Sequence, residues 1–221
     1  MNRRSSLLWL GSLITAGIVF PRGPVCAETM HLKVDTQKSV ISAVVKDPLS
    51  NLRDTPSYAE GTFDIITGDI DGDPDNIAST GKVKLVINAT TYNSGNSVRD
   101  RNVIGSALET GQYPRIQFES TRMEDVQVVT PGATGNVTVV GNLTIHGTTR
   151  EVRCPVSVSM SPDGIFTASG EVAFDYTDFG VKRPRLAFLI PASKEVSIKY
   201  RITATRPEAS GTPPAGGSGA Q

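Results

Sequence analysis

Period-two alternation of apolar and polar residues is the feature that most constrains the fold of this chain. In the run 115–119, Ile116 and Phe118 alternate with three polar residues, as expected for a strand with one buried and one solvated face. About eight such strands in succession predict an all-β fold, either a sandwich or a closed barrel. The other runs comprise a strand around residues 32–45 and the apolar sets Phe63/Ile65, Val83/Leu85/Ile87, Val137/Val139/Leu143/Ile145, Val152/Cys154/Val156/Val158, Phe166/Ala168/Val172/Phe174 and Val196/Ile198/Tyr200/Ile202.

The connections between these runs favour antiparallel pairing. Ser161-Pro162-Asp163-Gly164 separates two alternating runs and is typical of a hairpin turn. Residues 100–108 lack alternation, and we expect a short helix there before Tyr113-Pro114. The predicted fold is therefore an antiparallel all-β domain with one short helix.

Both ends of the chain differ in composition from the domain. Arg3 and Arg4 precede an apolar run, Leu7–Phe20, which is shorter than the roughly 20 residues of a membrane-spanning helix. Together with the small residues around Ala27, this predicts a signal peptide, residues 1–27, that is cleaved during export. We expect the β-domain in residues 28–205. The Pro/Gly/Ser/Ala-rich residues 206–221 form a predicted disordered tail.

The charge balance argues against nucleic-acid binding. Cleavage after residue 27 removes three arginines and no acidic residue, so the 22 basic residues fall to 19 against 22 acidic residues, a net charge of −3. A mildly acidic protein lacks the basic surface that contacts phosphates. We therefore expect no nucleic-acid partner and, after cleavage, no stable membrane span.

Few residues offer catalytic or metal-binding chemistry. The chain has two histidines, and we interpret His146 as a hydrogen-bonded turn residue. Cys154 lies on the apolar side of its run, as a small buried hydrophobe does. Residues 69–76 contain alternate carboxylates, but Pro74 and Thr80 stand where a calcium loop needs Gly and Glu, which favours an exposed acidic turn. The sequence predicts no catalytic residues, no metal and no cofactor.

Four successive segments resemble the signature segments of the YceI-like polyisoprenoid-binding family. The resemblance spans roughly residues 30–204, and it implies a lipocalin-like, eight-stranded antiparallel barrel in the bacterial periplasm with an isoprenoid amphiphile in its channel. Arg99, Asp100, His146 and Asp178 match motif positions, whereas Lys38-Ser39 and Tyr176 depart from the family pattern. The segments are residues 96–100, 113–120, 141–147 and 178–181.

The expected ligand is a polyprenyl phosphate or a quinone-like molecule. By alternation, the inward-facing residues that would line an apolar channel are Phe63, Ile65, Leu85, Ile87, Phe118, Leu143, Ile145, Phe174 and Ile198.

Two alternatives stay open beside this carrier, which we expect to be a monomer or a homodimer. One is a non-catalytic stress-related or surface interaction scaffold, in which the same side chains fill a solid core. The other is an enzyme acting on a lipid inside the barrel, for which His146 with Asp178 is the pair we nominate.

Overall fold

The computed structural model describes residues 29–46, 58–73, 76–127, 132–183, 185–186, 190–191 and 193–207. The predicted signal peptide, residues 1–27, lies outside this set, as do residues 208–221 of the predicted tail. Both terminal boundaries therefore stay predictions.

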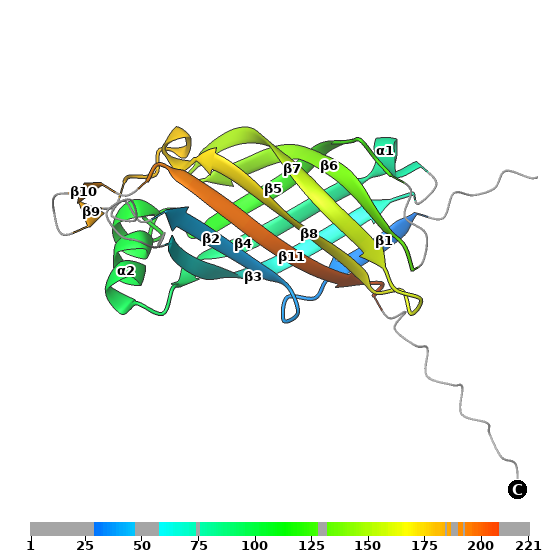
Figure 1. The fold of residues 1–221 in the computed structure, drawn as a ribbon, viewed down its shortest axis with the longest axis horizontal. Coiled ribbons are helices and arrows are strands. Elements are labelled where there is room, and N and C mark those ends of the chain that lie inside the picture. Colours follow the sequence, from blue (N-terminus) through cyan, green and yellow to red (C-terminus); the bar gives the residue numbers. More distant parts are fainter. Residues whose placement is uncertain are drawn as a thin grey trace, which may run out of the picture.

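The strands form a closed antiparallel barrel, in which β11 pairs with β8 on one side and with β1 and β2 on the other. This confirms the predicted eight-stranded fold (Figure 1). A separate pair consists of β9 (Arg185–Leu186) and β10 (Ile190–Pro191). The barrel strands are β1 (Met30–Val34), β2 (Val40–Lys46), β3 (Tyr58–Gly72), β4 (Lys82–Asn93), β5 (Arg115–Glu124), β6 (Thr134–Ile145), β7 (Thr148–Met160), β8 (Phe166–Asp175) and β11 (Glu195–Thr205).

The first barrel position is filled by two short strands, where the sequence predicted one strand over 32–45. Asp35 breaks the strand, because its carboxylate accepts hydrogen bonds from the backbone N–H groups of Gln37 at 3.0 Å and Lys38 at 3.2 Å. Both β1 and β2 lie between β3 and β11. Ser39 ties the break to β11 by exchanging hydrogen bonds with the backbone of Thr203. The two strands thus act as one kinked strand, which keeps the barrel eight-stranded.

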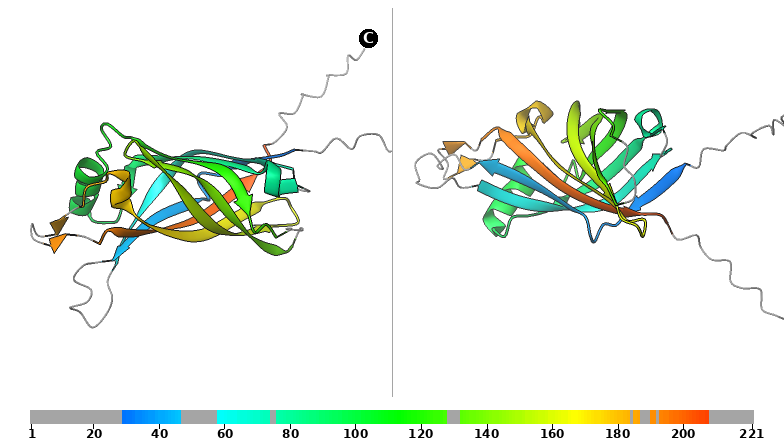
Figure 2. Two further views of the ribbon diagram at one scale, coloured as in Figure 1. Left: turned by 90° about the horizontal axis from the view of Figure 1, so that it is seen from above. Right: turned by 45° about the vertical axis from the view of Figure 1, so that its right-hand side comes forward.

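Helical segments lie at the two ends of the barrel. The predicted helix is present as α2 (Ser97–Asn102), capped by the Asn96 side chain, and continues into η3 (Val103–Ala107). The sequence did not predict α1 (Ile77–Thr80) or the 3₁₀ turn η4 (Tyr176–Phe179). Figure 2 shows that α1 and the α2–η3 segment lie at opposite ends.

The acidic segment before α1 differs from the exposed turn that we expected. β3 extends to Gly72, so Asp69 and Asp71 belong to a strand. Their carboxylates pair with Lys33 and His31 on β1. The acidic-turn interpretation is therefore wrong for these two residues, because charged partners on the neighbouring strand offset the repulsion that would keep the carboxylates apart.

Candidate ligand-binding cavity

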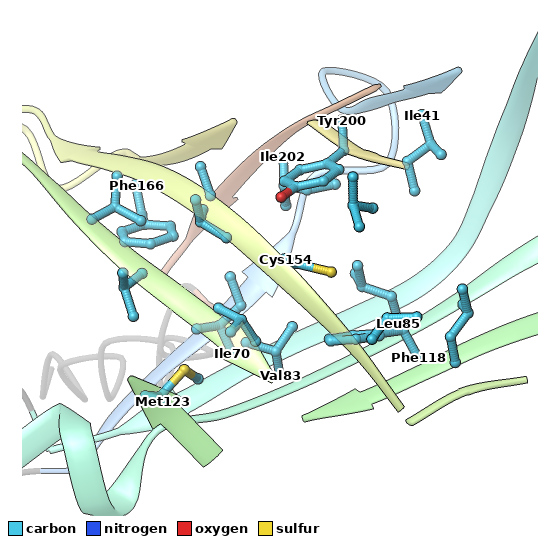
Figure 3. Close-up of a pocket in the computed structure, with 18 of the residues that line it drawn as sticks. Ile41, Ile70, Val83, Leu85, Phe118, Met123, Cys154, Phe166, Tyr200 and Ile202 are labelled. Atoms are coloured by element: carbon cyan, nitrogen blue, oxygen red, sulfur yellow. The ribbon is translucent and has the colours of Figure 1, made fainter. Parts of the chain in front are cut away.

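The barrel encloses a cavity of about 430 Å³. Figure 3 shows side chains from several strands, among them Val83, Leu85, Phe118 and Phe166, directed toward a common space. Ligand pockets in proteins have volumes of roughly 300 to 1,000 Å³, and this cavity falls within that range. The interior therefore has room for a ligand.

Most of the predicted channel residues lie on the cavity wall. Ile65 is the exception, since it is buried in the core with 6% of its surface exposed but does not line the cavity. It directly precedes a register shift in β3, where Ile66 and Thr67 are both exposed. The predicted residues on the wall are Phe63, Leu85, Ile87, Phe118, Leu143, Ile145, Phe174 and Ile198.

Sequence reasoning missed several wall residues that have the same character. Met123 and Met160 add flexible apolar side chains, and Val152, Cys154 and Val156 make β7 an apolar wall strand. The alternation of residues 152–158 already placed these β7 residues on one face, so the signal was present in the sequence. Met123 carried no such signal, because it follows the register shift between Ser120 and Arg122 in β5.

Two polar groups lie within the apolar wall. Burial raises the pKa of the Cys154 thiol to about 11, so the group is a neutral thiol at ordinary pH. Burial also raises the pKa of Tyr200, whose hydroxyl donates to the Pro155 carbonyl oxygen at 2.7 Å. Both groups are therefore uncharged, as an apolar interior requires.

The remaining polar residues of the wall lie at the α1 end. Asp71 and Asn76 precede α1, and Gln127 follows β5. The Gln127 side-chain oxygen accepts from the backbone N–H of Asn136 at 3.1 Å. No lysine or arginine lines the cavity in the part of the chain that the structure describes. The wall consequently offers no cation to a buried anion.

His146 occupies a strained position in the turn between β6 and β7. Its φ is +50° and that of Gly147 is +73°, so both central residues of this two-residue hairpin are left-handed. The imidazole Nε2 lies 2.6 Å from Glu109 Oε2, and the ring packs against Tyr113 with centroids 4.3 Å apart. These contacts confirm that His146 is a hydrogen-bonded turn residue. They also stabilise its unfavourable backbone conformation.

Glu109 links three segments at the α2 end of the barrel. Besides His146, it accepts a hydrogen bond from Lys182 Nζ at 2.7 Å. These two partners, Lys182 foremost, hold the pKa of the Glu109 carboxyl below its ordinary value. The nominated pairing of His146 with Asp178 is not made, since no hydrogen bond or ion pair joins these two described residues. The partner of His146 comes from the end of the helical segment instead.

The motif positions build the α2 end of the barrel and do not line the cavity. Arg99 and Asp100 lie in α2, where the Asp100 carboxylate accepts from Ser94 Oγ at 2.6 Å. Asp178 lies in η4, and His146 lies in the hairpin turn. These four positions therefore mark the architecture of one barrel end. The segments 113–120 and 141–147 also contribute alternating residues to the cavity wall, namely Ile116, Phe118, Leu143 and Ile145.

The structure also bears on metal binding and on membrane crossing. Within the described ranges, no cluster of three or more His, Cys, Asp or Glu side chains has an arrangement that could hold a metal ion. No helix among the described residues has the length and apolar character that crossing a membrane requires.

Comparisons with known proteins agree with the fold. The model of the YceI-like domain family matches residues 32–204. A UPF0312 protein of Shewanella oneidensis is 30% identical over 156 residues, which cover 68% of this chain and 76% of that protein.

Solved structures show the same architecture. The crystal structure of Burkholderia cenocepacia BcnA matches with a TM-score of 0.61 and 25% identity, covering 78% of this chain and 99% of that one. A polyisoprenoid binding domain from Saccharophagus degradans, implicated in plant cell wall breakdown, matches with a TM-score of 0.62 over 80% of this chain and 98% of that domain. At 16% identity, the second likeness concerns the fold alone.

Proposed function

The chain belongs to the YceI-like domain family, and we propose that it is an exported, non-catalytic carrier that holds an isoprenoid-type amphiphile in the barrel cavity. One observation carries the proposal, namely a cavity of about 430 Å³ with an almost entirely apolar wall. The relation in fold to a domain described as polyisoprenoid-binding supports the choice of ligand class. The predicted signal peptide supports an exported, periplasmic location.

The apolar wall supplies the driving force for binding. Removing apolar ligand surface from water contributes about 25 cal/mol per Å², or about 2.5 kcal/mol for each 100 Å² buried. Part of this is offset by the cost of association. An unbranched or isoprenoid chain suits the site because it exposes no polar atom that the wall would leave unsatisfied. A solid-core scaffold fits less well, because the side chains that would fill it surround open space.

The absence of cations from the described wall discriminates between the two expected head groups. A phosphate brought inside would lose its hydration without meeting a lysine or arginine. A quinone or hydroxyl head group carries no charge and avoids this cost. We therefore favour a quinone-like ligand, and a polyprenyl phosphate would have to keep its head group outside the cavity.

Native mass spectrometry of residues 28–221, purified from the export compartment, tests the proposal. We expect a stoichiometric adduct that organic extraction identifies as an uncharged isoprenoid. Ala168→Phe should abolish the adduct, because Ala168 lies on the cavity wall and the larger side chain takes up ligand space. The neighbouring Thr167→Phe is the matched control, since residue 167 is outside the wall. A bare mass with no uptake of added prenyl or quinone compounds would refute the carrier and favour the scaffold.

A further inference from the structure

Along part of the barrel wall, the neighbouring strands β7 and β8 are not joined by backbone pairing. β7 and β8 pair only from Val156 with Gly170 to Met160 with Phe166. Residues 148–155 of β7 pair with β6 alone, and residues 171–175 of β8 pair with β11 alone. All of these residues are described, so we define the β7–β8 seam as the boundary between residues 148–155 and 171–175.

Pro155 explains why the pairing stops. The next pair after Val156 with Gly170 would be Pro155 with Glu171, and proline has no N–H to donate to β8. The Pro155 carbonyl oxygen instead accepts from the Tyr200 hydroxyl at 2.7 Å. Tyr200 reaches it from β11 across Gly170, where any Cβ would overlap both the carbonyl oxygen and the tyrosine hydroxyl. A single side-chain hydrogen bond thus closes the inner end of the seam.

The cavity extends to both sides of this seam. Val152 and Cys154 line it from β7, and Val172 and Phe174 line it from β8. Cys154, Val172 and Phe174 are only half-buried. In Figure 3, Cys154 and Tyr200 border the same region of the cavity. Apolar wall residues therefore approach the surface where the strands are unpaired.

The outer end of the seam is closed by η4 and the residues after it. Phe179 is buried and packs against Phe174, with ring centroids 5.2 Å apart. Gly180 lies close to the His146 ring. Lys182 then pairs with Glu109, which also holds His146. Side-chain contacts, rather than a backbone ladder, hold this end together.

We propose that the ligand enters and leaves through the β7–β8 seam, with Tyr200 as the inner clasp and the contacts of Glu109 as the outer latch. The inference rests on the proposed carrier function. Separating the strands here breaks no backbone pair, whereas separating β6 from β7 or β8 from β11 along the same stretch would break a continuous ladder. The α1 end is the competing route, and the side chain of Ile77 packs there directly against Gly72.

A reversible cross-link provides the main test. Val172→Cys places a second thiol opposite Cys154 if the register of Val156 with Gly170 is continued across the seam. A dansyl-labelled farnesyl chain serves as the probe, and stopped-flow fluorescence gives its association and dissociation rate constants. We expect oxidation to slow both at least tenfold with little change in Kd, and reduction to restore them. The matched control is a cross-link within the paired ladder at positions outside the cavity wall, Ser159→Cys with Thr167→Cys, and its oxidation should leave the rates unaltered.

Two single substitutions test the seam without a cross-link. Pro155→Val supplies the missing N–H, so the ladder can extend and both rate constants should fall severalfold. Tyr200→Phe removes the clasp but keeps the ring, so both should rise severalfold. Rates that stay at wild-type values in the cross-linked protein and in Pro155→Val would overturn the route while leaving the carrier function intact. A protein that binds no probe at all would overturn the proposed function and the route together.

Discussion

The hydroxyl of Tyr200 allows a direct test of how the barrel wall is held together. Tyr200→Phe removes one oxygen atom and leaves the ring in place over Gly170. The lost hydrogen bond to the Pro155 carbonyl is 2.7 Å long and has a net contribution of about 1 kcal/mol. Pro155 is exposed, so water can solvate the freed carbonyl and little desolvation cost is added. We therefore expect destabilisation of about 1 kcal/mol.

Differential scanning calorimetry measures this change. In a domain of this size, 1 kcal/mol corresponds to a shift in Tm of about 2–4 °C, so Tyr200→Phe should lower Tm by about 2–4 °C. Tyr113→Phe is the matched control. Its ring contact with His146 is retained, and the hydroxyl has no hydrogen-bond partner among the described residues, so the change should stay within about 0.5 kcal/mol.

A Tm for Tyr200→Phe that equals that of the Tyr113→Phe control would refute the reasoning. The hydroxyl would then not hold the end of the β7–β8 ladder, and the inner clasp of the seam would have to be abandoned. A loss well above 4 kcal/mol would also contradict it, because a single hydroxyl cannot account for so large an effect.

Three further predictions concern titratable groups and the N-terminus. Since burial raises the pKa of Cys154 to about 11, its reaction with a water-soluble disulfide reagent should be slow near neutral pH and accelerate up to about that value; a fast reaction at pH 7 would contradict the burial. Glu109 has a lowered pKa in the fold, caused first by Lys182, so it stabilises the protein above its unfolded pKa, and this contribution is lost as the pH falls through the folded value. Lys182→Met should therefore shift acid unfolding to higher pH, as followed by circular dichroism, and an unchanged acid transition would show that the ion pair has no influence. Intact-mass measurement of the exported protein should give a chain that begins at Glu28, and a mass that retains residues 1–27 would rule out cleavage.

Much of the fold was predictable because alternation records the environment of each strand face. Ile116 and Phe118 alternate with polar residues, and in the structure both line the cavity. The break between β1 and β2 also had a signal that the sequence analysis did not use. Val34 and Ile41 are both buried but are separated by an odd number of positions, which one regular strand would place on opposite faces.

A similar switch of the buried residues between odd and even positions occurs in β3 next to Ile65. Phe63 and Ile65 occupy odd positions, whereas the buried Ile70 occupies an even one. A register shift between them is the only way for all three to face inward. This change in the alternation is visible along the whole strand but not within its short runs.

The sequence did not predict side-chain contacts between segments that lie far apart along the chain. Glu109, His146 and Lys182 belong to the helical segment, a hairpin turn and the residues after η4, and no local pattern brings them together. Their meeting depends on the barrel closing in three dimensions. The predicted pairing of His146 with Asp178 failed for this reason, since both candidates were chosen from motifs rather than from a shared surface.

The last strand completes the wall next to the first, because Lys33 pairs with Thr205 and Val34 with Ala204. No partial chain that lacks β11 can close the barrel, and contacts of such long sequence separation form slowly. During synthesis the apolar faces of the early strands consequently stay partly exposed until residues 195–205 are available to cover them. Late closure suits a protein that is proposed to be exported, because an incompletely folded chain can pass through a narrow translocation pore. The barrel and its ligand-sized cavity then form only after export.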